Sequence, residues 1–220
     1  SLLTSCRSSG VKVKTDDKGF YDYNGYIIKS EYPMDEQSLD KAGEKLRKIY
    51  ELYLKDQDVK TYFAIVPDKN AWAFEAEGQN VINYSELYAR MQAETEDFAS
   101  YIELDDLLDM ESYYKTDAHW RQEKIYPVAQ RIAEAMGCEL TAEYDKVVAN
   151  DSFIGAYGRQ SDLAMEPEEL IYLTNEALAG CIVTDYASED ERYVTTGVYT
   201  IASAASEDGE GYDMFLDGAK

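Results

Sequence analysis

The sequence predicts an α/β fold followed by a β-rich segment, and three observations carry that prediction. Over the first 140 residues, amphipathic helical stretches alternate with short runs of branched and aromatic residues, the order that builds a layered sheet covered by helices. After Thr141, strand-like runs follow one another between acidic turns. The chain of 220 residues, 45% hydrophobic and 13% aromatic, is long enough to bury a core.

The elements of the α/β part follow from hydrophobic periodicity and turn residues. In chain order they are a hairpin over about 11–29 with a turn at Asn24-Gly25, a helix from Asp35, a buried parallel strand over 61–66, a helix capped by Ser85 that runs to about Phe98, and a strand over 101–104. In such sheets ligands bind beyond the carboxyl ends of the strands. The segment from Tyr113 to Trp120 follows one of those ends.

A third helix is expected from about Ala118 to Met136, with Gly137 just past its end. Pro127 lies inside it, so we expect either a kink near Glu123 or a helix that begins only after Lys124. The domain plan has three segments. They are an N-terminal tether or leader remnant over 1–10, the α/β portion over 11–140, and an acidic β-rich excursion of the same domain over 141–220.

The net charge of −23 is unevenly distributed. Residues 1–138 hold 17 basic and 26 acidic side chains, whereas residues 139–220 hold 4 and 18. A negative field of this strength repels phosphate backbones, so nucleic acid is excluded as a main partner. The longest apolar run, 62–66, is far too short to cross a bilayer, so any membrane association would need a lipid anchor.

The three cysteines suggest an anchor rather than a metal site. Leu3-Thr4-Ser5-Cys6 resembles the bacterial lipobox, in which the cysteine is lipidated, although no signal-peptide stretch precedes it here. A lipidated Cys6 places the protein in the bacterial cell envelope, outside the cytoplasmic membrane. One arrangement then pairs Cys138 with Cys181. No cysteine pair has metal-ligand spacing, and we expect no metal and no cofactor.

The chemistry-bearing feature is Asp117-Ala118-His119-Trp120, which contains the only histidine of the chain. Histidine is the usual general base near neutral pH, and in acyl transfer a carboxylate orients it and stabilises its cation. Thr116 or Asp117 is expected to cap the helix that follows, with His119 in its first turn. The competing interpretation makes Asp117 only a cap and His119 a solvent-facing helix residue.

The longer string Thr116-Asp117-Ala118-His119-Trp120 resembles the Thr-Asp-x-His-Trp signature of the DHHW family, which is related to the SGNH-like proteins that acetylate bacterial alginate. Ala118 stands where the first histidine of the family name would be. The resemblance implies an SGNH hydrolase-like three-layer α/β sandwich. It also implies transfer or removal of an O-acetyl group on a cell-envelope or exported polysaccharide through a serine ester, with the acyl donor left open.

The nucleophile is the missing part of that interpretation. In the family the serine follows the Asp-His pair, after a later strand, and the only local match is Ser152 in Asn150-Asp151-Ser152. It is a weak candidate, because a polar turn before Phe153 explains the same residues. The end at 213–220 resembles mid-domain sequence. We therefore expect the chain to be incomplete at its C-terminus, with the nucleophile beyond Lys220.

Three further residues are candidates for substrate binding. Tyr114 and Trp120 flank the Asp-His pair and offer aromatic faces to a sugar. Arg159 suits an anionic sugar or the acyl group, with a surface ion pair as the alternative.

An alternative function for the whole chain is a non-catalytic envelope lipoprotein that binds glycan or protein partners. A metal-dependent hydrolase built on Asp117, His119 and acidic residues is a third hypothesis, which the lack of a second histidine disfavours.

Overall fold

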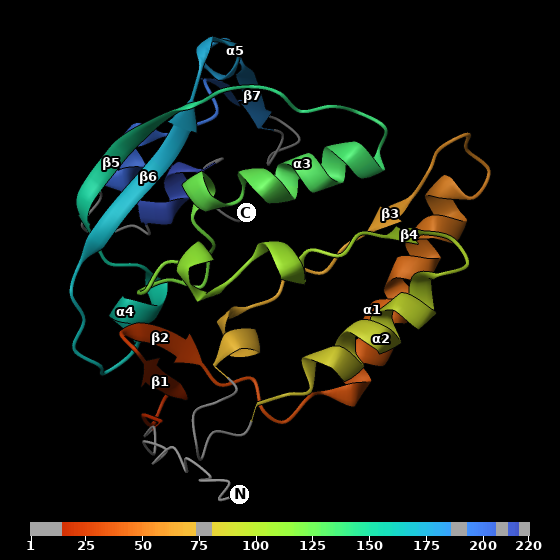
Figure 1. The fold of residues 1–220 in the computed structure, drawn as a ribbon, viewed down its shortest axis with the longest axis horizontal. Helices are drawn as coiled ribbons and strands as arrows, with labels where there is room; N and C mark the ends of the chain where they lie inside the picture. Colours follow the sequence, from red (N-terminus) through yellow and green to blue (C-terminus); the bar gives the residue numbers. More distant parts are fainter. Residues whose placement is uncertain (1–14, 74–80, 186–192, 206–210, 216–220) are drawn as a thin grey trace, which may run out of the picture. The chain divides into compact units, whose positions relative to one another are not determined.

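The computed structural model describes residues 15–73, 81–185, 193–205 and 211–215 (Figure 1). The chain forms two compact units, Ser1–Glu103 and Leu104–Lys220. Each unit is described by itself below. The segment over 113–120 that contains Asp117 and His119, called the Asp-His segment below, belongs to the second unit. So does the β-rich stretch that follows Thr141.

The first unit opens with an antiparallel hairpin. Strand β1 (Phe20–Tyr23) pairs with β2 (Tyr26–Lys29). Asn24 and Gly25 form the turn with φ of 52° and 85°, the left-handed pair that a two-residue type I′ hairpin needs. The predicted hairpin is confirmed for these strands, and its expected start near residue 11 lies outside the described residues.

Two helices follow, and each begins at an acidic or amide cap. Helix α1 (Glu36–Ile49) is capped by Asp35, whose carboxylate accepts from the Ser38 N–H at 3.0 Å. It continues into a π-helical turn over Tyr50–Leu54. Helix α2 (Tyr84–Thr95) is capped by Asn83, whose side-chain oxygen accepts from the Glu86 N–H. The prediction of Ser85 as the cap was wrong by two positions, because asparagine caps a helix as well as serine does.

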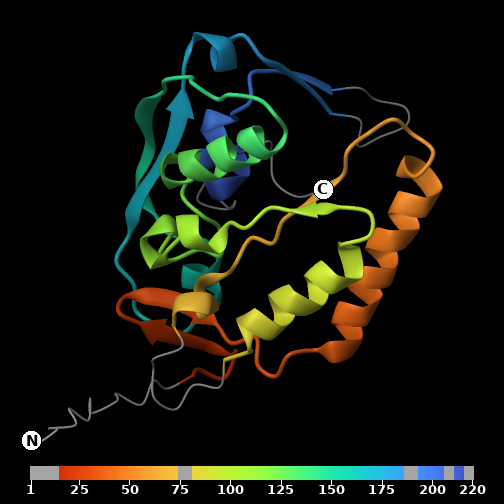
Figure 2. The same cartoon turned by 45° about the vertical axis from the view of Figure 1, so that its right-hand side comes forward.

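Helices α1 and α2 lie side by side, as Figures 1 and 2 show. They approach closely at Gly43, where a β-carbon would stand 3.0 Å from Cγ of Glu94. Arg47 donates to both carboxylate oxygens of Asp97 at 2.7 and 3.1 Å. Arg90 of α2 pairs with Glu36 near the start of α1, so the two helices run parallel. Exposed ion pairs of this kind add only about 0–1 kcal/mol each and mainly fix the register.

Each helix is followed by a strand, and the two strands pair in parallel. Strand β3 (Tyr62–Phe63) lies next to β4 (Ser100–Tyr101). The predicted helix–strand repeat is therefore present. The prediction of a buried strand over 61–66 was wrong in extent, because the pairing covers only two residues and Val66 is 47% exposed.

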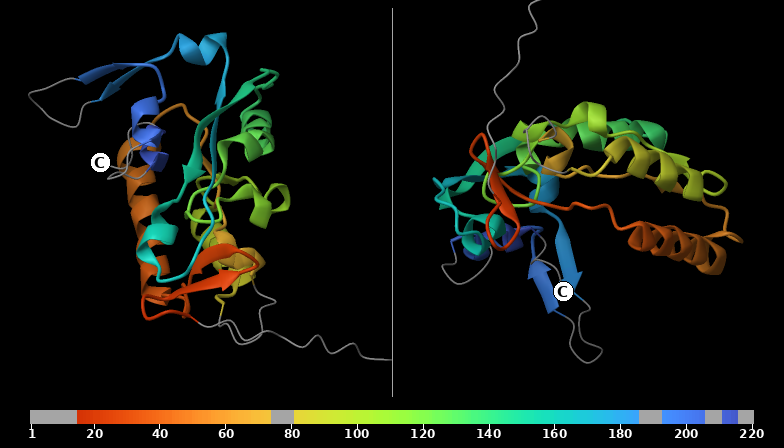
Figure 3. Two further views of the ribbon diagram at one scale, coloured as in Figure 1. Left: turned by 90° about the vertical axis from the view of Figure 1, so that its left-hand side faces the viewer. Right: turned by 90° about the horizontal axis from the view of Figure 1, so that it is seen from below.

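The second unit contains the long antiparallel pair of the β-rich stretch, seen at the left of Figure 1 and again in Figure 3. The strands of this unit are β5 (Asp145–Phe153), β6 (Glu168–Thr174), β7 (Ile182–Asp185) and β8 (Tyr193–Thr196). β5 pairs with β6 and β7 with β8, both antiparallel. The β5–β6 register shifts twice, between Val148 and Asn150 and again before Phe153. The polar turn expected around Ser152 is thus an irregular end of a strand.

The helices of this unit are short. They are α3 (Tyr126–Ala135), α4 (Ala156–Gln160), α5 (Glu176–Ala179) and α6 (Ile201–Ala204). The expected helix from Ala118 was wrong at its start, because α3 begins eight residues later. Pro127 sits in its first turn, where a missing N–H costs nothing, so the alternative of a start after Lys124 is confirmed. Gly137, with φ of 75°, follows its end.

A small aromatic core holds the second unit together. Its buried members are Tyr114, Phe153, Leu170, Ala204 and Met214. Tyr114 comes from the Asp-His segment, so the segment is tied directly to the core. The ring of Tyr114 meets that of Phe153 edge to face at 5.2 Å between centroids, a favourable aromatic geometry.

The described residues form four separate two-stranded sheets within a mixed α/β fold. The three-layer SGNH sandwich stays a prediction. The arrangement that pairs Cys138 with Cys181 is not formed, because both are exposed free thiols. Cys6 lies outside the described residues. Among the helices described, none is long and apolar enough to cross a membrane.

Candidate active site

The Asp-His segment is a closed loop rather than the first turn of a helix. Tyr113 and Trp120 pair as an antiparallel bridge, and the Tyr114 N–H donates to the His119 carbonyl at 3.1 Å. Asp117 and His119 lie within this loop. The side chain of Asp117 accepts the His119 N–H at 3.0 Å inside the loop.

The carboxylate of Asp117 is the most tightly held group of the loop. Its side chain has no exposed surface. Oδ1 accepts from the His119 ring Nδ1 at 2.5 Å and from the His119 N–H, and Oδ2 accepts from the Ala156 N–H at 2.7 Å. Burial raises the pKa of Asp117, but these hydrogen bonds outweigh burial and lower the pKa below its ordinary value. Asp117 is therefore a buried, ionised hydrogen-bond acceptor.

The imidazole of His119 is held on one side and open on the other. Its side chain is 49% exposed, and its ring stacks on Tyr212 with centroids 3.8 Å apart and planes 9° from parallel. Nδ1 faces Asp117, and within the described residues Nε2 has no hydrogen-bond partner. Burial, followed by the charge of Asp117, raises the pKa of Tyr212, so the phenol beside the imidazole is protonated at neutral pH. An oriented histidine with a free Nε2 has the geometry of a general base.

The backbone around Gly155 shapes the pocket for the carboxylate. A β-carbon at Gly155 would lie 2.3 Å from both Cβ and Oδ2 of Asp117, so only glycine fits. The Gly155 N–H donates to Oγ1 of Thr116 at 2.9 Å, and the Gly158 N–H donates to the Thr116 carbonyl at 2.8 Å. The first turn of α4 therefore binds both Thr116 and Asp117, and its N–H groups favour the negative charge.

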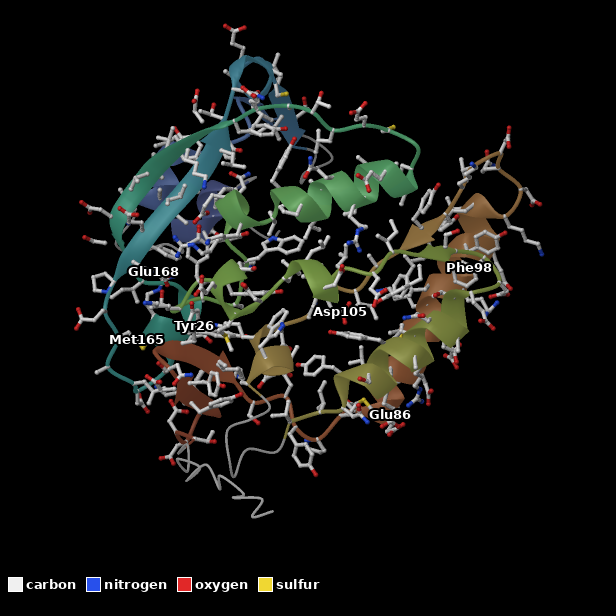
Figure 4. All side chains as sticks on the ribbon, in the orientation of Figure 1. Tyr26, Glu86, Phe98, Asp105, Met165 and Glu168 are labelled. Carbon is white, nitrogen blue, oxygen red and sulfur yellow. The ribbon has the colours of Figure 1, made fainter. Side chains whose placement is uncertain are left out.

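Glu168, the first residue of β6 and labelled in Figure 4, clamps the other side of the loop. Its Oε1 accepts from the N–H of Thr116 at 2.8 Å and from the Thr116 hydroxyl at 2.9 Å. Its Oε2 accepts from the Lys115 N–H at 3.0 Å and from Nη1 of Arg121 at 3.1 Å. Four donors converge on one carboxylate that is only 8% exposed. Charge-assisted bonds in such a setting are among the stronger ones in proteins.

The candidate substrate residues lie in three different environments. Tyr114 is fully buried in the core, so it supports the loop and offers no face to a sugar. Trp120 lines a cavity of about 310 Å³ together with Ile125, Tyr199 and Tyr212. Tyr212 also stacks on His119, so the cavity and the imidazole share one neighbouring ring, although His119 itself does not line the cavity.

Arg159 and Ser152 do not join the Asp-His pair. The guanidinium of Arg159 is exposed and donates to the Ile154 carbonyl at 2.9 Å, which is neither the expected ion pair nor a contact with the loop. The hydroxyl of Ser152 donates to Asp151 at 3.0 Å on the exposed side of β5. In the described part of the chain, the imidazole therefore has no serine partner.

Sequence reasoning missed four contributors to the site: Gly155, Ala156, Glu168 and Tyr212. The string Phe153-Ile154-Gly155-Ala156-Tyr157-Gly158, with two glycines after a strand, is a signal of close backbone approach. Glu168 and Tyr212 have no local signal, because they reach the loop from 52 and 93 positions away in the sequence. Over the described residues, no group of three His, Cys, Asp or Glu side chains is arranged to hold a metal ion.

The described fold and loop define a class: a mixed α/β protein in which a buried carboxylate orients a half-exposed histidine. By sequence, no family profile and no curated protein matches this chain.

Solved structures do resemble it. Bacillus cereus PatB1 with a sulfonyl adduct superimposes with a TM-score of 0.70 at 17% identity, over 94% of this chain and 72% of that one. A second structure of Bacillus cereus PatB1 gives 0.67 at 19% identity, over 92% and 71%. A DHHW family protein from Eubacterium siraeum gives 0.69 at 16% identity, over 95% and 71%. At these identities the likeness establishes the fold.

The structural likeness to a DHHW family protein agrees with the resemblance found in the Thr116–Trp120 motif. The further relation to the alginate acetylation proteins stays a prediction.

Proposed function

We propose that this chain carries the base half of a serine-type O-acetyltransferase or acetylesterase that acts on a cell-envelope or exported polysaccharide. The observation that supports this most directly is the geometry of one pair. Asp117 is fully buried and its Oδ1 lies 2.5 Å from Nδ1 of His119, while Nε2 has no partner in the described residues. This is the arrangement that fixes a histidine to accept the proton of an attacking hydroxyl.

The chemistry of the step is that of general base catalysis followed by acyl transfer. Nε2 of His119 removes the proton from a serine hydroxyl, and the serine oxygen attacks the acetyl carbonyl of the donor. The buried charge of Asp117 stabilises the imidazolium that forms. His119 then returns the proton to the leaving oxygen. The attacking serine is proposed to lie outside the present sequence.

The polysaccharide part of the proposal rests on the lining of one cavity. The cavity that Tyr212 shares with Trp120 and Tyr199 is lined by these aromatic side chains, whose faces suit the apolar face of a pyranose ring. The nucleophile part has a separate support, the structural neighbour with a sulfonyl adduct, because sulfonyl groups attach covalently to activated hydroxyls. The acyl donor and the sugar are left open.

The test is acetate release from an acetylated oligosaccharide by the full-length protein. His119→Gln should lower the rate by roughly 10² to 10⁴, the usual contribution of a general base. Ser152→Ala should keep full activity, and its inactivity would return Ser152 to the role of nucleophile. Equal turnover by the wild type and His119→Gln would remove the proposal.

A non-catalytic role in binding glycan or protein partners is the second candidate. One observation favours it, since within the described residues no hydroxyl contacts Nε2 of His119. This alternative predicts that acetylated or unmodified glycans bind to the chain with affinities that Asp117→Asn and His119→Ala leave unchanged. A glycan array with these variants separates the two, provided that each variant is shown to be folded.

We further propose a location in the bacterial cell envelope, with a lipid on Cys6 as the tether. The support is the Leu3-Thr4-Ser5-Cys6 resemblance to a lipobox. The intact mass of the full-length protein made in bacteria should exceed that of Cys6→Ala by the mass of the lipid. Equal masses, corrected for the substitution, would rule out the tether.

A further inference from the structure

One hydrogen bond does not fix the plane of the His119 imidazole. Asp117 binds the ring through Nδ1 at 2.5 Å, which directs that edge of the ring toward the carboxylate. The ring can still tilt about the line that joins the two atoms, and its half-exposed side chain has room to do so. A base must present its free nitrogen at about 3–3.5 Å from the reacting atom, in an aligned geometry. A second contact is therefore needed to hold the ring plane.

Tyr212 provides this second contact. Its phenol ring lies against one face of the imidazole, with centroids 3.8 Å apart and planes 9° from parallel. Tilting the imidazole toward this ring would push atoms below their favourable separation of about 3.5–4.0 Å. The hydrogen bond to Asp117 acts in the plane of the imidazole, whereas the stack acts across it. The two contacts therefore restrain different motions of the same ring.

The ring of Tyr212 is itself packed by other aromatic rings. It meets Phe215 with centroids 4.8 Å apart and planes 48° from parallel, and it meets Tyr114 edge to face at 6.1 Å. Tyr114 belongs to the buried core of the second unit. Because a side chain packed in this way keeps one rotamer, Tyr212 offers the imidazole a fixed surface.

The backbone that carries Tyr212 is anchored on both sides. It forms a single turn of 3₁₀ helix, Gly211–Met214. A β-carbon at Gly211 would stand 3.1 Å from Cδ2 of Phe153, so the glycine lets the turn lie directly on the core. Met214, at the other end of the turn, has no exposed surface and is a member of that core. The position of the phenol ring is thus set by the core of the unit.

We infer that Tyr212 is a positioning residue for His119: its ring face holds the imidazole plane so that Nε2 points in one direction. The consequence for a reaction rate rests on the proposed function, whereas the order of the imidazole does not. The alternative is a role confined to core packing. In that case loss of the Tyr212 ring would lower stability and leave the imidazole of the folded protein as ordered as before.

NMR relaxation of the imidazole C–H bonds measures this order without a substrate. In the full-length protein, isotope-labelled at histidine, the His119 signals are identified by their loss in His119→Gln. Their order parameter should be near the value of about 0.85 that is typical of rigid groups, both in the wild type and in Tyr212→Phe, which keeps the ring face. Tyr212→Leu removes the face and should lower the order parameter to about 0.6 or below.

Two further variants make the measurement decisive. Tyr126→Leu is the matched control, because Tyr126 is a half-buried tyrosine of the same unit whose ring packs on Tyr144; it should leave the order of the imidazole unchanged. If Tyr212→Leu does not fold, Tyr212→Met supplies a longer, flexible apolar side chain without a flat face. It should lower the order parameter in the same way.

The rate of acetate release shows whether Tyr212 acts through His119. Tyr212→Leu should lower kcat roughly 10- to 100-fold, since a misplacement of about 1 Å can cost about 10² in rate, and Tyr212→Phe should recover most of this loss. Because Tyr212 also lines the cavity with Trp120, KM should rise as well. In the His119→Gln background, Tyr212→Leu should lower kcat less than about twofold, because residues that act as a unit are not additive.

Several results would overturn the inference. They are an order parameter that neither Tyr212→Leu nor Tyr212→Met lowers, equal disorder in Tyr212→Phe and Tyr212→Leu, and a loss of order in Tyr126→Leu as large as that in Tyr212→Leu. A rise in KM with unchanged kcat, or an equal fall in kcat with and without His119, would also overturn it. If wild type and His119→Gln release acetate equally, the proposed function fails, and the relaxation data still decide the role of Tyr212.

Discussion

Replacing Asp117 by asparagine removes one charge and one acceptor from the centre of the loop while keeping the shape of the side chain. Asp117 now accepts three hydrogen bonds with its two oxygens, two at Oδ1 and one at Oδ2. Asparagine has one oxygen and one NH₂ group. In either orientation, at least one buried backbone N–H, of His119 or of Ala156, faces another donor.

The cost can be worked out from these contacts. A buried donor left without an acceptor costs about 1–3 kcal/mol, and hydrogen bonds to a charged acceptor contribute about 1.5–3 kcal/mol each. We expect Asp117→Asn to lower the free energy of unfolding by about 3 kcal/mol in all. In a chain of this length that corresponds to a fall in Tm of roughly 6–12 °C.

Urea and thermal unfolding followed by circular dichroism measure this loss. Asp151→Asn, an exposed aspartate in β5, is the matched control and should stay within about 0.5 kcal/mol of the wild type. Because His119 is the only histidine, long-range nitrogen–proton NMR also shows its tautomer without overlap. The wild type should hold the proton on Nδ1, and Asp117→Asn should lose this preference. A variant as stable as the control, with an unchanged tautomer, would refute the description of the loop.

Three further predictions concern the groups around this carboxylate. Gly155→Ala places a β-carbon 2.3 Å from Asp117 and should lower the free energy of unfolding, measured with denaturant, by about 1–3 kcal/mol. Gly180→Ala, with neighbours no closer than 3.6 Å, should leave it nearly unchanged. Equal losses of stability in the two variants would count against the close approach at Gly155. Since the folded-state pKa of Asp117 is lowered, the stability that its carboxylate adds to the fold should be complete above about pH 4 and lost as pH falls through the lowered pKa. The free energies of unfolding of wild type and Asp117→Asn should therefore converge in acid. A difference between them that stays constant with pH would contradict this. Glu168→Gln leaves one oxygen for four donors and should speed hydrogen exchange at the Lys115 and Thr116 amides; protection equal to that of the wild type would argue against the clamp.

The local elements of the first unit could be predicted because their signals are local. Asn24-Gly25 specifies its turn by two left-handed residues, and Asp35 caps α1 with its own carboxylate. The extent of the strand over 61–66 could not be predicted. Whether a branched apolar run pairs along its whole length depends on its neighbour, and here β4 pairs with only two of its residues.

The chemistry of the candidate site could be predicted in part. The sequence placed a carboxylate and a histidine two residues apart, and the structure joins them by a direct hydrogen bond. The backbone around them was predicted wrongly as helix, because the groups that hold the loop, Gly155, Ala156 and Glu168, are distant in sequence. Tertiary hydrogen bonds outweighed the helical pattern that continues into α3. The roles assigned to Asp117 and His119 in catalysis stay predictions.

The most direct test of the central claim is covalent labelling of the full-length protein by a small sulfonyl fluoride, followed by intact mass. A serine that His119 activates should take up a single sulfonyl group, and His119→Gln should slow this reaction by roughly 10² to 10⁴. The folded state of each variant is checked by circular dichroism. One adduct on one serine, dependent on His119, is the predicted result. No adduct, or equal rates for wild type and His119→Gln, would contradict the assignment of Asp117 and His119 as the base of an acyl-transfer site.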